Sequence, residues 1–160
     1  MYCIAGKNQC SIDALEYLLN RPDVKNENIC VCPNNDDIGE DTWQPSLLKF
    51  ANKKNIQSKD LKELYSINDL KFFSLEYDRI VDTSYFESNR LFNFHFSLLP
   101  KYRGCHTNYL QIKNGEKYTG VTCHEIDNGI DSGKMIDRIR YSIKINDTAR
   151  ENYIKLMSTS

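Results

Sequence analysis

A side-chain amide and an imidazole stand two residues apart within Leu91–Gly104, which reads LFNFHFSLLPKYRG. The apolar residues at its start predict a short strand that ends at a serine- and proline-containing loop. Asn93 and His95 then share one face, because side chains alternate along a strand. An amide can donate a hydrogen bond to a developing oxyanion, and an imidazole can move a proton. The pair therefore indicates a site for oxyanion stabilisation and proton transfer.

A structural role for this pair remains open on the residues alone. A histidine in an aromatic strand is often a core residue with one satisfied nitrogen. Asn93 favours a functional site, because an amide buried among Phe and Leu side chains is costly without a partner. The spacing of the pair does not decide between these interpretations.

A second segment, Thr119–Gly133, reads TGVTCHEIDNGIDSG. Together, NFHFSLLPKYRG and TGVTCHEIDNGIDSGKMI resemble the formyltransferase family that uses N10-formyltetrahydrofolate. That family carries an Asn-x-His-x-Ser-Leu-Leu-Pro segment, then a Gly-Val-Thr strand, then an Asp-Ser/Thr-Gly loop. The resemblance is dense over Phe92–Ile136, follows the family's order and is highly specific.

The resemblance implies a catalytic trio of Asn93, His95 and Asp131. An amine would attack the formyl carbon of the folate through a tetrahedral intermediate. Asn93 would donate to the oxyanion, and His95 would accept or relay the proton that the amine loses. Asp131 would couple to His95 and help protonate the leaving folate nitrogen. By itself, an aspartate in a Gly-rich turn is usually a turn former.

The resemblance also implies which residues contact the co-substrate N10-formyltetrahydrofolate. These are Phe73, Ser74, Leu75, Ile126, Asp127 and Gly129. For the first three, an ordinary apolar strand entrance explains the pattern equally well. No metal and no covalent nucleophile is expected, because the folate carries the activated carbon.

The N-terminal segment predicts a strand at Tyr2–Ala5, a glycine turn and a helix that ends near Leu19. This order opens many nucleotide-binding α/β units, but no Gly-x-Gly-x-x-Gly is present to support a dinucleotide site. Lys7 and Asn8 lie where the predicted helix begins, which indicates an anion site. A solvated surface lysine is the alternative for Lys7.

The opening Ala-Gly-Lys-Asn is similar to that of the sugar-nucleotide N-formyltransferases within the family. The resemblance thus implies transfer of formyl to the amine of a nucleoside-diphosphate amino deoxysugar, most simply a dTDP-linked one. Lys7, Asn8, Trp43, Tyr102 and Arg103 are the expected substrate contacts, and Arg103 can bind phosphate in a bidentate manner. Trp43 has an alternative role, capping a helix against the sheet.

Two other functions stay open. A glycinamide ribonucleotide-type formyltransferase is one, although this chain lacks the Gly-Ser-Asn phosphate loop of those enzymes. A non-catalytic sugar-nucleotide or folate binding module is the other.

The predicted fold class is α/β, with a Rossmann-like, open, twisted, mostly parallel sheet and helices on both faces in a single domain. Further strands are expected at residues 28–33, 77–81, 118–127 and 134–145. A last helix is expected at Ala149–Met157, with Asp147 as its cap. Residues 1–160 are expected to form the catalytic domain, without the smaller C-terminal subdomain that the family commonly has.

The 160 residues carry a net charge of −1, are 40% hydrophobic and 27% charged, which suits a globular protein with small-molecule partners. No basic footprint for nucleic acid, no membrane span and no leader is visible. A cytoplasmic location is therefore expected, and a homodimer is left open.

Six cysteines raise the alternative of a zinc site. A Cys2His2 set could combine Cys105 and His106 with Cys123 and His124. The chelate spacing is missing, and successive residues of a strand point to opposite faces. The sequence therefore favours no metal.

Overall fold

The computed structural model describes residues 1–158, and the chain divides into two compact units, Met1–Phe92 and Asn93–Ser160. The first unit contains four parallel strands in the order β3-β2-β1-β4. Their bounds are Tyr2–Gly6 for β1, Ile29–Pro33 for β2, Gln57–Ser58 for β3 and Lys71–Leu75 for β4. The helices are α1 (Gln9–Leu19), α2 (Leu47–Lys53) and α3 (Leu61–Leu64), with 3-10 turns η1 (Asn26–Asn28) and η2 (Thr83–Tyr85).

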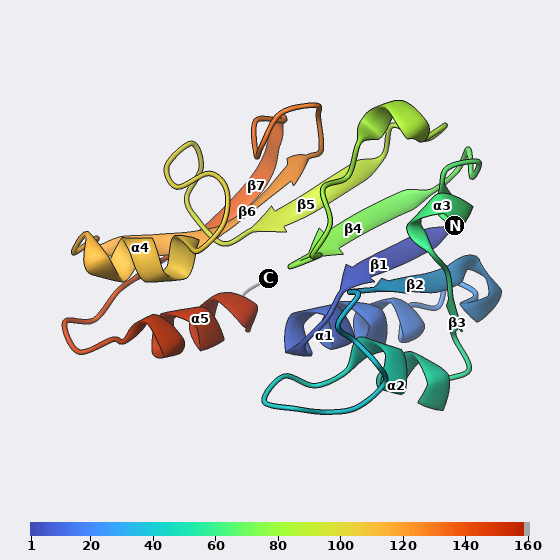
Figure 1. Cartoon of the computed structure of the whole chain (residues 1–160), viewed down its shortest axis with the longest axis horizontal. Helices are drawn as coiled ribbons and strands as arrows, with labels where there is room; N and C mark the ends of the chain where they lie inside the picture. Colours follow the sequence, from blue (N-terminus) through green and yellow to red (C-terminus); the bar gives the residue numbers. More distant parts are fainter. Residues whose placement is uncertain (159–160) are drawn as a thin grey trace. The chain divides into compact units, whose positions relative to one another are not determined.

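Helix α1 forms where the sequence predicts it. Its apolar residues Ile12, Leu15 and Leu18 recur at three-residue intervals and are all buried. The Asn8 side chain caps the helix by accepting a hydrogen bond from the Cys10 N–H. Helix α1 packs on β1 and on α2, and α2 packs on β2 (Figure 1).

The strand expected at residues 77–81 is wrong, because the strand of this region is β4 at Lys71–Leu75. The chain turns at Glu76, whose φ is +55°. Asp78 then binds the loop after β2 by accepting from the Asn35 N–H at 2.8 Å. Ile80 is 88% exposed, whereas Val81 is buried, so this segment enters the core only at its end and not as a strand.

The second unit is built on strands β5, β6 and β7, which are neighbours in this order. Strand β5 (Leu91–His95) begins in the first unit, and β6 (Tyr118–Glu125) pairs antiparallel with β7 (Met135–Ser142). Helices α4 (Thr107–Lys113) and α5 (Ala149–Met157) contact each other beside these strands (Figure 1). The α/β fold class with a mostly parallel arrangement of strands is therefore confirmed.

Buried polar contacts attach α4 to its neighbours. Gln111 donates to the Phe96 carbonyl at 2.9 Å, and its own carbonyl accepts from the Thr119 hydroxyl. The expected cap of α5 is wrong, because Thr148 and Glu151 form its capping box. Asp147 instead accepts from the Lys144 N–H at 2.8 Å and pairs with Lys155.

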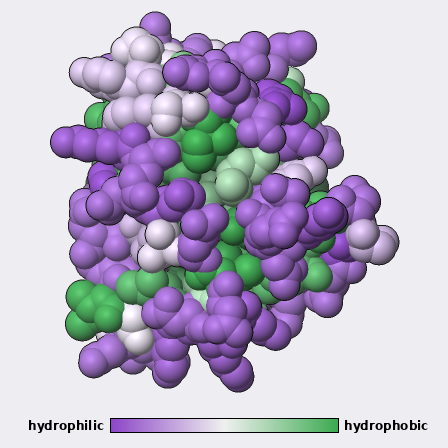
Figure 2. All heavy atoms as spheres, turned by 90° about the vertical axis from the view of Figure 1, so that its right-hand side faces the viewer, coloured by the Kyte–Doolittle hydropathy of each residue, from purple (hydrophilic) through white to green (hydrophobic). Residues whose placement is uncertain are grey.

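Hydrophilic residues predominate on the face drawn in Figure 2, and apolar residues appear there in smaller areas between them. Across residues 1–158, no helix has both the length and the apolar character that a membrane crossing requires.

Candidate active site

Four polar side chains of the second unit meet where β5 ends. Asn93 and His95 come from β5, and His124 comes from β6, at an irregularity in its pairing with β7. Asp131 comes from the loop between β6 and β7, where its φ is +47°. The structure thus brings Asn93, His95 and Asp131 together, as the sequence predicts, and adds His124.

The carboxylate of Asp131 is the centre of this cluster. Its Oδ1 accepts from Asn93 Nδ2 at 3.1 Å and lies 3.3 Å from His124 Nε2. Its Oδ2 accepts from the Gly104 N–H at 2.8 Å and lies 3.3 Å from His95 Nδ1. Burial would raise the pKa of Asp131, but these contacts outweigh it and hold that pKa below its usual value. Asp131 is therefore an anion at neutral pH.

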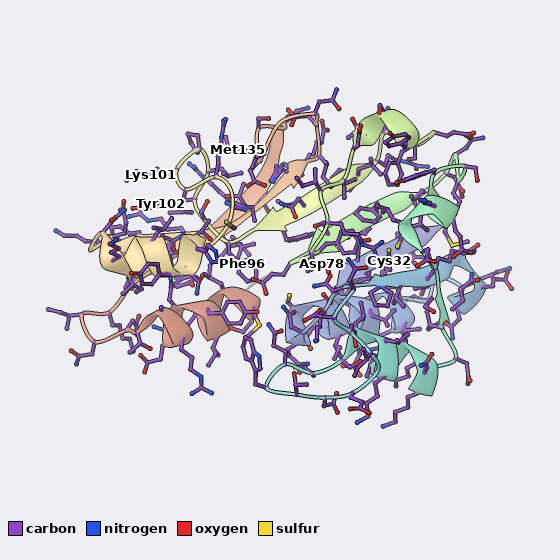
Figure 3. The ribbon with its side chains drawn as sticks, viewed as in Figure 1. Cys32, Asp78, Phe96, Lys101, Tyr102 and Met135 are labelled. Atoms are coloured by element: carbon purple, nitrogen blue, oxygen red, sulfur yellow. The ribbon has the colours of Figure 1, made fainter. Side chains whose placement is uncertain are left out.

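The backbone of Tyr102 sets the tautomer of His95. His95 Nε2 lies 2.6 Å from the Tyr102 carbonyl oxygen, which can only accept, so this nitrogen carries a hydrogen. Tyr102 has a φ of +58°, and its hydroxyl is held by Glu116 and Asn114 at 2.9 and 3.0 Å. The labelled Lys101 and Tyr102 lie together on this loop in Figure 3. The nitrogen of His95 that can take up a proton is therefore Nδ1.

His95 Nδ1 and Asp131 Oδ2 face each other as two acceptors when both groups are deprotonated. Burial lowers the pKa of His95, although the Tyr102 carbonyl and Asp131 oppose this effect. The imidazole is thus neutral at neutral pH, with its lone pair directed at the carboxylate. One added proton converts this contact into a charge-assisted hydrogen bond. The pair is arranged to receive a proton.

His124 is a residue of the cluster that the sequence did not assign to it. Its Nδ1 donates to the Glu125 carbonyl at 2.7 Å, and the residue is 2% exposed. Burial disfavours the charged ring, but Asp131 and the Glu125 carbonyl outweigh burial and raise the pKa of His124. Alternation along the predicted strand 118–127 could have placed His124 on the face of Thr122, but the sequence had no sign that this face meets Asn93.

The remaining residues expected in the second unit have varied surroundings. Asp127 Oδ1 accepts from the Gly129 N–H at 3.0 Å and from the Ser132 hydroxyl at 2.8 Å, so Asp127 forms the turn that carries Asp131. Ile126 is half-buried, whereas Gly129 is exposed. Arg103 is exposed as well, while Tyr102 is half-buried.

Lys7 and Asn8 are buried residues of the first unit, at the end of β1. Lys7 Nζ lies 3.2 Å from Asp36 Oδ2, and the residue is 6% exposed, so the solvated-lysine alternative is wrong. Asn8 Nδ2 donates to Glu76 at 2.6 Å. Both side chains therefore have acidic partners within the first unit.

The other expected residues of the first unit differ in exposure. Ser74 and Leu75 are buried, and the half-buried Phe73 ring stacks on Phe92 with centroids 5.5 Å apart. Trp43 is 78% exposed, so the alternative that it caps a helix against the sheet is wrong.

Within residues 1–158, no group of three or more His, Cys, Asp or Glu side chains is arranged to hold a metal ion. The zinc alternative also conflicts with His124, because both ring nitrogens already have partners. All six cysteines are free thiols, and Cys105 is exposed.

Comparison with solved structures places these observations in a family. An N-formyltransferase from Helicobacter canadensis, solved with folinic acid and dTDP-3-aminofucose, is 47% identical with a TM-score of 0.95, over 99% of this chain and 58% of that chain. WlaRD, a sugar 3N-formyl transferase solved with dTDP and 5-N-formyl-THF, is 48% identical with a TM-score of 0.94. The match covers 98% of this chain and 57% of that chain. Phosphoribosylglycinamide formyltransferase from Bacillus halodurans, at 19% identity and a TM-score of 0.74, shares the fold.

Curated relatives match over shorter stretches. The bifunctional polymyxin resistance protein ArnA of Wigglesworthia glossinidia brevipalpis is 38% identical over 112 residues, which cover 67% of this chain and 17% of that protein. Methionyl-tRNA formyltransferase of Macrococcus caseolyticus is 48% identical over 64 residues, which cover 40% of this chain and 21% of that protein. The chain thus spans a minor part of these relatives and just over half of the two similar solved chains. The family model described as formyl transferase matches residues 6–159, and the chain therefore belongs to the formyl transferase family.

Proposed function

We propose that this chain carries the catalytic centre of an N-formyltransferase that moves a formyl group from N10-formyltetrahydrofolate to the amine of a dTDP-linked amino deoxysugar. The observation that carries this proposal is the likeness to two sugar N-formyltransferases, at 47% and 48% identity over nearly the whole chain. One is named a sugar 3N-formyl transferase and the other was solved with dTDP-3-aminofucose, which favours a 3-amino over a 4-amino sugar.

The contacts of the cluster support the following catalytic roles. His95 Nδ1 and Asp131 Oδ2 together take up the proton of the attacking amine, because His95 Nε2 is committed to the Tyr102 carbonyl. Asp131 stabilises the imidazolium that results. Asn93 donates to the oxyanion of the tetrahedral intermediate, a contribution of about 10²–10³ in rate for such a donor. His95 then returns this proton to the folate nitrogen as that nitrogen leaves.

The remaining assignments concern binding. Phe73, Ser74 and Leu75, with Ile126, Asp127 and Gly129, are proposed to contact the folate. Lys7, Asn8 and Trp43, with Tyr102 and Arg103, are proposed to contact the sugar nucleotide. Six free cysteines fit a reducing compartment, which supports a cytoplasmic location.

An assay with dTDP-3-aminofucose and N10-formyltetrahydrofolate tests the proposal, with mass spectrometry to detect a product heavier by one formyl group. Glycinamide ribonucleotide and a dTDP-4-amino sugar serve as matched acceptors. We expect formamide only from the 3-amino sugar. Formylation of glycinamide ribonucleotide alone would show that the chain catalyses the glycinamide ribonucleotide reaction instead. The absence of product from every acceptor would contradict the proposal.

A further inference from the structure

The hydrogens of the Asn93 amide are both engaged in the structure. Nδ2 lies 3.1 Å from Asp131 Oδ1 and 3.2 Å from His124 Nε2. The amide orientation follows from these partners, because a flipped amide would direct its oxygen at the carboxylate. An NH2 group has two hydrogens. While both contacts persist, Asn93 has no N–H left for an oxyanion.

The second of these contacts depends on the charge of His124. The Glu125 carbonyl can only accept, so His124 Nδ1 carries a hydrogen in either state. In the neutral ring, Nε2 is a lone pair that accepts from Asn93. In the charged ring, Nε2 is a donor, and its acceptor is Asp131 Oδ1 at 3.3 Å. Two donors cannot bond to each other, so protonation breaks the contact between Asn93 and His124.

We propose that protonation of His124 is the switch that releases one Asn93 N–H for the oxyanion of the formyl-transfer intermediate. His124 is then a positioning residue, since it acts through Asn93. Asp131 keeps one Asn93 hydrogen in both states, so the amide does not rotate away when the second hydrogen is released. The part of this proposal that concerns the oxyanion rests on the proposed function.

The charged groups around His124 favour the released state. Asp131 faces Nε2, and Asp127 adds a second negative charge from the loop between β6 and β7. The His95 ring lies 6.4 Å away and is neutral while it waits for the amine proton. These surroundings keep the pKa of His124 above its usual value, so the switch operates on the alkaline side of His95.

The kinetic test is the pH dependence of kcat at saturating substrates for the wild type and His124→Gln. The Gln side-chain amide takes the place of Nε2 and donates to Asp131 without titrating. Wild-type kcat should fall about tenfold per pH unit above the His124 pKa and level off about 10²–10³ lower. His124→Gln should keep the acid limb and lose the alkaline limb. At high pH its kcat should therefore exceed that of the wild type. An alkaline limb that persists in His124→Gln overturns the proposal.

His106→Asn is the matched control, because His106 is exposed and asparagine tolerates its φ of +59°. This variant should keep the wild-type alkaline limb, and loss of that limb would assign it to His106 instead.

A second readout needs no substrate. The side-chain amide signals of Asn93, assigned by their loss in Asn93→Asp, are followed by NMR during a pH titration. They should shift with the same midpoint as the His124 ring and stay constant over that range in His124→Gln. Amide signals that ignore the His124 titration overturn the switch. An enzyme without formyl transfer contradicts the proposed function but leaves this titration readable, so the two failures are distinguishable.

Discussion

The end of β1 in the first unit and the end of β5 in the second both gather polar side chains, but they satisfy them differently. At the end of β1, Lys7 pairs with Asp36 and Asn8 donates to Glu76. Each donor there meets an acceptor, so the contacts need no proton transfer. At the end of β5, His95 Nδ1 and Asp131 Oδ2 are two acceptors 3.3 Å apart.

This difference separates a site suited to binding from a site suited to chemistry. Complementary donor–acceptor pairs hold their geometry and can be exchanged for contacts with a ligand. A facing pair of acceptors lacks one proton and gains a charge-assisted bond when it receives it. We therefore expect changes at the first site to alter stability or affinity, and changes at the second to alter turnover.

The largest effect is expected for Asp131→Asn. The new amide offers a neutral group in place of the anion that stabilises the His95 imidazolium, so kcat should fall by about 10³-fold or more. Initial rates of formamide formation measure this. Asp127→Asn, in the same loop, should keep kcat at saturating folate within a few-fold, because the asparagine carbonyl still accepts from the Gly129 N–H and the Ser132 hydroxyl. Equal losses in both variants would show that Asp131 acts through loop structure alone.

Asn8→Ala should lower the free energy of unfolding by about 1–3 kcal/mol. The substitution removes the cap of α1 and leaves alanine at a φ of +82°, which asparagine tolerates better because its side chain hydrogen-bonds locally. Asn8→Gly also lacks the cap but tolerates this φ, so it should lose less. Urea denaturation of both variants tests the order. A glycine variant less stable than the alanine variant would contradict the assigned strain.

Lys7→Met should raise the KM for the sugar nucleotide about tenfold and leave kcat nearly unchanged, because a lost contact made equally in ground and transition states appears in KM. The methionine fills the volume of the buried stem, and Asp36 is exposed enough to remain hydrated. Lys53→Met, on α2, is the control. A fall in kcat for Lys7→Met would place Lys7 at the reacting atoms instead.

The smallest effect concerns pH and stability, and it has opposite signs for the two histidines. His124 has a raised pKa when folded, so its contribution is complete below pH about 6.5 and is lost as pH rises through the raised value. His95 has a lowered pKa, so the wild type loses stability as pH falls below about 6.5 toward that value.

Urea denaturation at pH 5.5 and 8.5 compares the wild type with His124→Gln and His95→Gln. The stability lost in His124→Gln should be larger at the lower pH, and that lost in His95→Gln should be larger at the higher pH. The same trend in both variants would contradict the opposite pKa shifts.

The regular elements were largely predictable because their causes are local. Three- and four-residue spacing of apolar residues predicted α1, and the fold class followed from the order of strands and helices. The strand predicted at residues 77–81 was wrong because these residues form a loop. Asp78 fixes that loop through hydrogen bonds with Asn34 and Asn35. Hydrogen bonds between residues so distant in the sequence cannot be predicted from the pattern of neighbouring residues.

The sequence by itself determined that Asn93 and His95 share a face, since a strand alternates its side chains whatever surrounds it. It also placed an aspartate in a Gly-rich loop whose motif resembles that of a known family. Only the tertiary structure decided which nitrogen of His95 can take up a proton, and that His124 engages an N–H of Asn93. Those facts depend on contacts between β5, β6 and their loops, which arise from strand register and loop closure rather than from spacing along the chain.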